Sequence, residues 1–318
     1  MTNLTIALKD LSKADVPDAL RVGTYFDLKA YPSVHEELLV GEGINSVIDV
    51  VANIGQYARK WIADTIARKV GGGAAKRVSG ADIGCAQCLG RFEAYVEEGA
   101  VFQPANILGV IGDDKEPFKI YVAKGTSILG SSIFLNEGDI FVGEDNVIEQ
   151  GVGVKGPTII GNKNEIRHGA YFRGSVIIGD GCTLRGELKN VLLLDKANFP
   201  HPSYLGDSIC GYMSHFGNQV TAANVGIFQG LVDSKDRVNI TLDIDGTVYD
   251  AGTKKLGIIV GDWSQVGCNS VADPATFLAP YTVVYPLTAI RKGFYGPRQI
   301  LKYKPMEKGV IEVSSLRK

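Results

Sequence analysis

The sequence predicts a mainly β protein built around a parallel β-helix, and three observations support this fold class. Apolar residues stand at every sixth position through a long stretch, and a glycine-containing tetrad returns within it after every third sextet. Glycine is also abundant, at 39 of 318 residues, as expected of a fold with many tight corners. An α-helix repeats every 3.6 residues and an ordinary strand every two, so neither produces a period of six.

The six-residue spacing holds without a break over eight apolar positions. These are Val142, Ile148, Val154, Ile160, Ile166, Phe172, Ile178 and Leu184. Because roughly half of the residues in a soluble protein are apolar, eight consecutive matches arise by chance less than about once in a hundred trials. We therefore expect each of these side chains to point into a common core.

The longer repeat indicates how the sextets are arranged. Val142-Gly-Glu-Asp, Ile160-Gly-Asn-Lys and Ile178-Gly-Asp-Gly follow one another at intervals of three sextets. Three sextets that form one triangular coil produce both periods at once, and stacked coils bury a continuous core. Each sextet then supplies a short strand and a corner, and the glycine fits a crowded or positive-φ corner.

The spacing is interrupted once and then returns. It breaks at Asn190, continues loosely through Leu193, Phe199 and Leu205, and resumes over Val260, Val266, Ala272, Leu278, Val284 and Ile290. The residues from Arg237 to Tyr249 alternate as two strands around Asp245-Gly246, which is a hairpin turn signal. We therefore expect a hairpin that leaves the coil.

The first part of the chain shows a different pattern. Apolar residues between Ile44 and Ile66 recur at three- and four-residue steps, and the glycines at 71–73 end the helix that this spacing predicts. Its other face is only moderately charged, which favours packing against its own protein over a membrane or partner helix. A second short helix is expected over 80–98. The predicted domains are a helical domain over 1–100, a β-helix over 101–290 with a hairpin insertion at about 225–257, and a basic tail over 291–318.

The composition is that of a soluble globular protein. Hydrophobic residues make up 45% and charged residues 21%, and the net charge of −2 argues against a nucleic-acid-binding surface. The charged N-terminus does not resemble a signal peptide, and no apolar stretch is long enough to span a bilayer. Five cysteines predict a reducing cytoplasm. Cys85 and Cys88 form a lone C-x-x-C without a second pair or nearby histidines, so an incidental pair is favoured over a zinc or redox site.

The densest polar cluster falls where the sextets break. If three sextets form one coil, Arg173 and Lys189 lie nearly one coil apart on the same edge, and His201 follows about two-thirds of a turn later. A histidine close to two cations suits proton abstraction from a substrate that is held by its anionic group.

Three segments carry a resemblance to a known family. They are Gly186-Glu-Leu-Lys-Asn, His201-Pro-Ser-Tyr-Leu-Gly-Asp-Ser-Ile-Cys-Gly and Gly217-Asn-Gln-Val-Thr-Ala-Ala-Asn. Over about residues 130–290 the chain resembles the acetyltransferase domain of bifunctional glucosamine-1-phosphate acetyltransferase / N-acetylglucosamine-1-phosphate uridyltransferase. The resemblance implies a left-handed β-helix, a homotrimer with sites between adjacent subunits, acetyl-CoA as acyl donor and an amino-sugar phosphate as acceptor.

The resemblance also implies roles for individual residues. His201 matches the general base, and Asn224 matches an asparagine near the reacting groups. Residues expected to bind the sugar phosphate are Arg173, Glu187, Lys189, Tyr204, His215 and, reaching in from a neighbouring subunit, Lys254 or Lys255. Gly217, Asn218, Cys268 and Ala279 match positions that line the acetyl-CoA groove. The plainer alternatives are a loop histidine at 201, a surface ion pair of Arg173 and Lys189 with Glu187, and a solvated basic tail in place of one that contacts coenzyme phosphates.

Two departures from the family pattern bear on function. His215 replaces an asparagine that contacts substrate, and Gly217-Asn-Gln-Val replaces Gly-Ala-Gly-Thr. The nucleotide loop of the uridyltransferase domain has no counterpart, so we expect no uridyl transfer. The sequence thus predicts a cytoplasmic acyltransferase that needs no metal and has no nucleic-acid or membrane partner. The alternative is a non-catalytic scaffold or binding protein for a sugar phosphate or nucleotide sugar.

Overall fold

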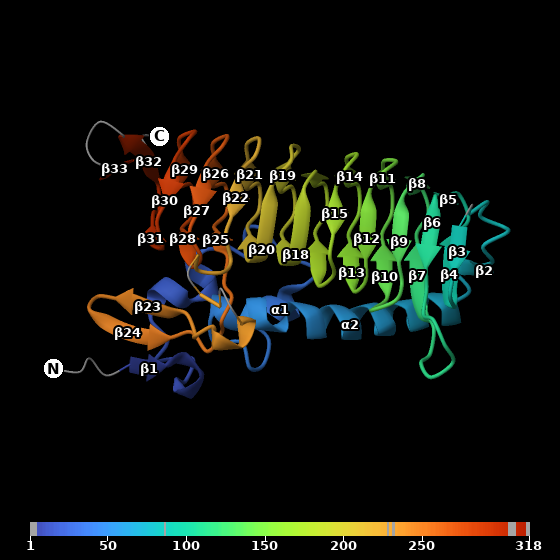
Figure 1. Ribbon diagram of the computed structural model, residues 1–318, viewed down its shortest axis with the longest axis horizontal. Helices are drawn as coiled ribbons and strands as arrows, with labels where there is room; N and C mark the ends of the chain where they lie inside the picture. The colour runs from blue at the N-terminus through green and yellow to red at the C-terminus, as the bar shows by residue number, and fades with distance from the viewer. Residues whose placement is uncertain (1–4, 86, 228, 231–232, 305–309, 316–318) are drawn as a thin grey trace. The chain divides into compact units, whose positions relative to one another are not determined.

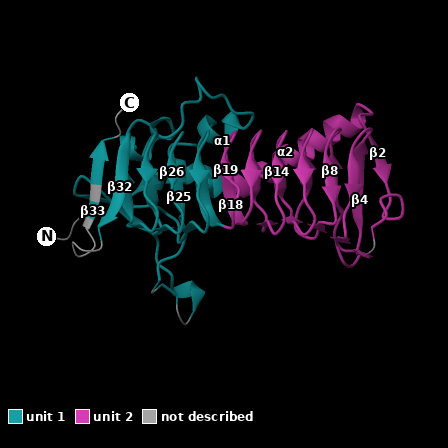
Figure 2. Cartoon of the chain, turned by 90° about the horizontal axis from the view of Figure 1, so that it is seen from above, with its two compact units in different colours: residues 1–53, 203–318 teal, residues 54–202 magenta. Residues whose placement is uncertain are grey.

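A computed structural model describes residues 5–85, 87–227, 229–230, 233–304 and 310–315 (Figure 1). The chain divides into two compact units, which are treated separately below (Figure 2). The first unit comprises residues 1–53 and 203–318, and the second comprises residues 54–202. Both units consist mainly of short parallel strands joined at corners. Among the described residues, no helix is both long and apolar enough to cross a membrane.

The second unit is a parallel β-helix with three strand-bearing faces. On one face, Phe141 lies opposite Ile159 and Ile159 lies opposite Ile177, so one coil takes the expected three sextets. Its strands are β2 (Ala75–Val78), β3 (Gln87–Leu89), β4 (Phe92–Glu97), β5 (Val101–Gln103), β6 (Asn106–Leu108), β7 (Phe118–Val122), β8 (Ser127–Leu129), β9 (Ser132–Phe134), β10 (Ile140–Val142), β11 (Val147–Ile148), β12 (Gly153–Lys155), β13 (Thr158–Ile160), β14 (Glu165–Ile166), β15 (Tyr171–Phe172), β16 (Val176–Ile178), β17 (Thr183–Leu184), β18 (Glu187–Leu193) and β19 (Asn198–Phe199).

The core of this unit is the predicted one. All eight side chains of the six-residue series, from Val142 to Leu184, are at most 1% exposed. Burying one side chain of this size stabilises a protein by about 1.5–3 kcal/mol, so the stacked row is a main source of cohesion between coils. The predicted fold class, mainly β with a left-handed parallel β-helix of hexapeptide repeats, is confirmed.

The repeated glycines are needed because neighbouring coils crowd them. A Cβ added at Gly143 would lie 2.5 Å from Oδ1 of Asn162, and one added at Gly161 would lie 2.4 Å from Oδ1 of Asp180. Each of these oxygens accepts a hydrogen bond from the backbone of the coil that it touches, at Glu144 and Asn162 respectively. The positive φ angles fall later in the tetrad, at Asp145 and Lys163.

The register break at Asn190 has a simple geometric origin. Val176 pairs with Val191 and Thr183 pairs with Asn198, so this coil is half a sextet shorter than the coils before it. The coil closes with one corner shortened, and Asn190 turns that corner with a φ of 55°.

The helix α2 (Val47–Gly71) has most of its length in the second unit, where it lies along the coils (Figure 1). Gly55 approaches the hydroxyl of Ser175, and the ring of Trp61 meets that of Phe141 edge-on at 5.1 Å. The predicted amphipathic helix is therefore present, and its apolar face packs on the β-helix.

The prediction of a helix over 80–98 is wrong, because β3 and β4 occupy this region. Both pair in parallel with later strands, Cys88 with Ile107 and Phe92 with Phe118, so the coils begin before residue 101 and residues 1–100 are not a purely helical domain. These first coils are longer than three sextets, because loops are inserted at their corners. A period of six is therefore invisible in this part of the sequence.

The first unit begins with turns and short helices. These are η1 (Leu8–Asp10), η2 (Asp18–Leu20), η3 (Val22–Thr24) and α1 (Glu36–Val40). The strands, with one further turn η4 (Ser234–Asp236), are β1 (Thr5–Ala7), β20 (Tyr204–Cys210), β21 (His215–Phe216), β22 (Thr221–Ala222), β23 (Thr241–Ile244), β24 (Thr247–Asp250), β25 (Ile258–Val260), β26 (Gln265–Val266), β27 (Val271–Ala272), β28 (Thr276–Leu278), β29 (Val283–Val284), β30 (Ala289–Ile290), β31 (Gly293–Tyr295), β32 (Gln299–Lys304) and β33 (Val310–Ser315).

An excursion separates two coils of the first unit. Ile209 pairs directly with Ile259, and the intervening chain contains the hairpin of β23 and β24. Asp245 and Gly246 turn the hairpin with φ angles of 51° and 80°, as the sequence predicts. The strand β1 adds to β24 in parallel and completes a three-stranded sheet (Figure 1).

The basic C-terminal segment is not a free tail in its described part. Val283 pairs with Ile300, so β32 continues the coil, and β33 folds back on β32 in antiparallel register. Arg298 lies over the ring of Tyr281, and Lys302 lies over that of Tyr285. These cations pack against aromatic rings of the preceding coil.

Candidate functional site

The predicted site residues are divided between the two units. Arg173, Glu187, Lys189 and His201 belong to the second unit. Those in the first unit are Tyr204, His215, Gly217, Asn218, Asn224, Lys254, Lys255, Cys268 and Ala279. Each group is described within its own unit.

The two predicted phosphate-binding cations occupy matching positions on adjacent coils. Tyr171 pairs with Glu187 and Phe172 with Leu188, so Arg173 and Lys189 each follow at the next position. Nη1 of Arg173 lies 2.7 Å from Oε1 of Glu187, and both side chains are more than 40% exposed. An ion pair this exposed contributes at most about 1 kcal/mol to stability, so a substrate anion can compete for Arg173 at little energetic cost.

His201 lies in an accessible loop at the corner that follows β19. Leu184 pairs with Phe199, so His201 lies one coil after Gly186 at the matching position. Gly186 directly precedes β18, the strand that carries Glu187 and Lys189. The imidazole is exposed, as a base that must reach a substrate requires.

Two arginines hold this loop by its backbone. The N–H of Arg185 donates to the carbonyl of Phe199 at 2.7 Å, and Nη1 of Arg167 lies 3.5 Å from the carbonyl oxygen of Pro200. Arg167 also pairs with Glu165 at 2.8 Å. Sequence reasoning missed Arg167, although it stands one full coil before Arg185 in the regular part of the repeat.

In the first unit, Tyr204 and Asn224 converge on Gly206. Leu205 pairs with Ala222, which brings the two coils into register. A Cβ at Gly206 would lie 2.5 Å from Nδ2 of Asn224 and 2.7 Å from the hydroxyl oxygen of Tyr204, so only glycine leaves room between these groups. Nδ2 of Asn224 donates to Oδ2 of Asp207 at 2.6 Å, which orients the amide and leaves Oδ1 of Asn224 as an acceptor.

Two polar groups here have no counterpart among the predicted site residues. Asp207 orients the amide of Asn224, although the sequence indicates it only as part of a motif. The hydroxyl of Ser203, beside Tyr204, is buried and makes no hydrogen bond within the described part of the chain. A buried hydroxyl without a partner costs about 1–3 kcal/mol, so it is a group that a ligand can satisfy.

Three of the four predicted coenzyme-A residues come together at one corner. Phe216 pairs with Val266, and the backbone N–H of Asn218 donates to Sγ of Cys268 at 3.2 Å. A Cβ at Gly217 would lie 2.7 Å from the backbone nitrogen of Cys268. Ala279 lies at a different corner, after β28, and is buried.

The remaining predicted residues are spread over the first unit. His215 lies in β21, opposite Gln265, and is half-buried. Lys254 is exposed after the hairpin, where its Nζ donates to the carbonyl of Lys235 at 3.2 Å. Lys255 is half-buried beside it. The backbone N–H of Leu256, the residue after Lys255, donates to the carbonyl of Asn224 at 3.1 Å, so the backbone at Lys255 lies near Asn224.

Comparisons with known proteins find two relatives that match about a third of this chain. No family model matches the chain. It is 25% identical over 106 residues to the bifunctional sugar-1-phosphate nucleotidylyltransferase/acetyltransferase of Sulfurisphaera tokodaii, covering 33% of this chain and 24% of that protein. It is 30% identical over 98 residues to the bifunctional protein GlmU of Methanococcus vannielii, covering 31% of this chain and 22% of that protein. The predicted resemblance is thus confirmed, over about a quarter of each relative's length.

Two solved structures are also similar at low identity. One is a mutant of AntD, an N-acyltransferase from Bacillus cereus in complex with dTDP and coenzyme A, at 13% identity and a TM-score of 0.24, covering 76% of this chain and 91% of that chain. The other is the UDP-N-acetylglucosamine acyltransferase from Campylobacter jejuni, at 14% identity and a TM-score of 0.20, covering 70% of this chain and 73% of that chain.

Proposed function

We propose that this protein transfers an acetyl group from coenzyme A to the amine of an amino-sugar phosphate, with His201 as general base. The observation that supports this most is the position of the accessible His201 imidazole, which matches Gly186 on the adjacent coil. Gly186 leads into the strand on which Lys189 stands at the position matching Arg173 of the coil before. The similarity to a bifunctional sugar-1-phosphate nucleotidylyltransferase/acetyltransferase agrees with this proposal.

The reaction needs one base and a few hydrogen-bond donors. The acceptor reacts as the neutral amine, after its ammonium form has released one proton to water; the nitrogen lone pair adds to the thioester carbonyl and His201 takes the remaining proton that the nitrogen must lose. The C–S bond then breaks, and the leaving thiolate takes the proton back from the imidazolium. Backbone N–H groups at the coil corners stabilise the oxyanion, so the chemistry requires no metal.

The other predicted residues take binding roles in this proposal. Arg173, Lys189 and Tyr204 hold the phosphate, Glu187 binds the sugar, and Asn224, oriented by Asp207, binds near the reacting nitrogen. Gly217, Asn218, Cys268 and Ala279 line the coenzyme groove. His215 contacts the acceptor, and Lys254 or Lys255 reaches the site of a neighbouring subunit in a cytoplasmic homotrimer.

The test is release of coenzyme A thiol from acetyl-CoA in the presence of glucosamine 1-phosphate or glucosamine 6-phosphate. We expect His201→Ala to lower kcat by about 100-fold or more, which is the usual contribution of a general base. His168→Ala is a matched control, because His168 is also exposed and stands at the same corner two coils earlier. Unchanged turnover in His201→Ala would refute the proposed base.

A second candidate function is a non-catalytic sugar-phosphate binding protein. The bond from the Asn218 N–H to Sγ of Cys268 favours it, because this amide is already occupied at the corner proposed for the coenzyme. A ligand that binds only the native state raises the melting temperature. An upward shift with glucosamine 1-phosphate but none with saturating acetyl-CoA would support the binding protein over the enzyme.

A further inference from the structure

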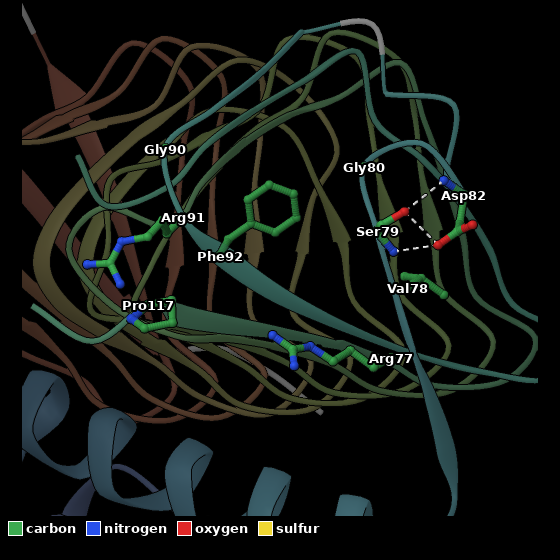
Figure 3. A pocket seen from close by; sticks show the side chains of 9 residues that line it. All are labelled: Arg77, Val78, Ser79, Gly80, Asp82, Gly90, Arg91, Phe92 and Pro117. Carbon is green, nitrogen blue, oxygen red and sulfur yellow. Dashed lines mark hydrogen bonds between the residues drawn. The ribbon is translucent and has the colours of Figure 1, made fainter. Parts of the chain in front are cut away.

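A separate cleft lies in the second unit, and none of its lining residues is assigned to acyl transfer. It has a volume of about 720 Å³, within the range of small-molecule sites. Its walls come from β2, the turn after it, the start of β4 and Pro117, which precedes β7 (Figure 3). The long coil from Phe92 to Phe118 contributes this last wall through its inserted loop.

The cleft has a cationic side and a hydroxyl–carboxylate side. Figure 3 shows the guanidinium group of Arg91 to the left of the Phe92 ring and that of Arg77 below the ring, with Ser79 and Asp82 to the right. Phe92 and Pro117 supply the apolar surface between them. A ligand with a charged group at one end and a ring beside it matches this division.

Arg91 is held in place by the inserted loop. Its Nε and Nη2 donate to the carbonyl of Gly112 at 3.1 and 2.7 Å, and Nη2 also donates to the carbonyl of Lys115 at 2.6 Å. Nη1 takes no part in these bonds. The nearby carboxylate of Asp113 lies 3.4 Å away and is almost fully exposed, so it competes weakly for the cation. The guanidinium is therefore oriented while one nitrogen remains available.

Arg77 adds a second cation from the neighbouring strand. Its Nη2 pairs with Oε1 of Glu93 at 3.0 Å, and the side chain is 64% exposed. Nε and Nη1 take no part in this pair. Two planar guanidinium groups with unused donors favour a phosphate, whose oxygens accept several charge-assisted bonds at once.

The opposite side of the cleft gives the ligand a direction. The Asp82 carboxylate accepts from the hydroxyl and the backbone N–H of Ser79, both at 2.7 Å. These two hydrogen bonds hold the pKa of Asp82 below its usual range, and the bond from the Ser79 side chain has the larger effect. An ionised carboxylate repels phosphate and accepts hydrogen bonds from hydroxyl or amine groups, so the phosphate end of a ligand turns to the arginines.

We propose that this cleft binds a small phosphorylated compound whose ring stacks on Phe92, with the phosphate held by Arg77 and Arg91. The ring of the ligand is a nucleobase or a sugar ring, since both offer a surface that packs on an aromatic side chain. This site is additional to the proposed acyl-transfer site and shares no residue with it.

The test is calorimetric titration of the full chain with uridine 5′-monophosphate, ribose 5-phosphate and inorganic phosphate. We expect both ring compounds to bind more tightly than inorganic phosphate. Arg77→Ala should weaken both by about tenfold or more, since it removes charge-assisted bonds. Tighter binding of uridine 5′-monophosphate than of ribose 5-phosphate identifies a nucleoside phosphate, and equal binding identifies a sugar phosphate.

The controls separate this site from general charge effects and from acyl transfer. Arg68→Ala removes an exposed arginine of α2 outside the cleft and should bind as the parent does. Phe92→Leu should weaken the two ring compounds and leave inorganic phosphate unchanged, with melting curves to verify folding. Arg77→Ala should keep its acetyl-transfer rate. Unchanged affinity in Arg77→Ala, or equal loss in Arg68→Ala, would overturn the proposal.

Discussion

Each unit contains a buried carboxylate that ties an N-terminal segment to the coils, and the two differ in their partners. In the second unit, Glu97 accepts hydrogen bonds from Tyr121, from the backbone N–H of Lys124 at 3.0 Å and from Nζ of Lys69 on α2 at 3.2 Å. In the first unit, Asp262 accepts from the backbone N–H groups of Asp27 and Tyr212 at 2.7 and 2.8 Å. One carboxylate has a cation among these partners, and the other is bonded to neutral donors.

The partners set opposite directions for the two pKa values. Burial raises the pKa of Asp262 to about 6, against the lowering effect of its two backbone hydrogen bonds. Burial also tends to raise the pKa of Glu97, but the hydrogen bonds of Tyr121, Lys124 and Lys69 and the charge of Lys69 outweigh it, so this pKa lies below its usual value. A buried carboxylate therefore favours its charged form only where a cation or enough donors compensate for lost hydration.

The largest effect is expected from removal of the buried Glu97 carboxylate. Glu97→Ala leaves Lys69 and the Tyr121 hydroxyl without their acceptor, and we expect the free energy of unfolding of the second unit to fall by about 3–4 kcal/mol. The chain has two tryptophans, one in each unit, so denaturation of a Trp263→Phe background followed by Trp61 fluorescence reports on the second unit.

Lys124→Ala is the matched control for this experiment. It keeps the backbone N–H that binds Glu97 and removes only an exposed ammonium paired with Glu144 at 3.5 Å, so a loss below about 1 kcal/mol is expected. Equal losses in Glu97→Ala and Lys124→Ala would contradict the role of the buried carboxylate.

The next effect is a pH dependence of the first unit. Between the unfolded pKa of about 4 and the folded pKa of about 6, the native protein holds a proton on Asp262 that the unfolded chain releases. The contribution of Asp262 to stability is therefore complete below about pH 4 and falls by up to roughly 3 kcal/mol as the pH rises to about 6. Trp263 fluorescence in a Trp61→Phe background measures it, and Asp262→Asn should remove this slope.

Glu97 produces the opposite sign in the same pH titration. Its pKa is lowered on folding, so its contribution is complete above the usual glutamate value and is lost as the pH falls through the folded pKa. If Trp61 and Trp263 report stability profiles of the same sign in acid, the contrast between the two carboxylates is wrong.

The smallest effect on stability is expected at the exposed ion pair of the proposed site. Arg173→Ala should lower the free energy of unfolding by at most about 1 kcal/mol, because its pair with Glu187 is solvated. The same variant should raise KM for the amino-sugar phosphate by about tenfold or more, since a charge-assisted bond is lost. A larger loss of stability than in Glu97→Ala would make Arg173 a structural residue instead.

Much of the candidate site follows from register alone. Because coils stack at a near-constant interval, the sequence predicts that Arg173 and Lys189 stand at matching positions, and the strand pairing agrees. Asp207, Ser203 and Arg167 were missed as site-forming groups, because their roles depend on which backbone or side-chain atoms the next coil brings near them.

The sequence by itself determined the coil and its core, the helix α2 and the hairpin at Asp245-Gly246. Each of these depends on a local period or turn signal, and inward-facing residues such as Ile160 and Phe172 repeat because every coil has the same three sides. Only the tertiary structure decided that residues 87–89 and 92–97 form strands, that Gly143 is required by crowding, and that β32 and β33 close the end of the coil. It also decided the opposite pKa directions of Glu97 and Asp262. Such features arise where residues distant in sequence share a buried space, and no local pattern records which partners will meet there.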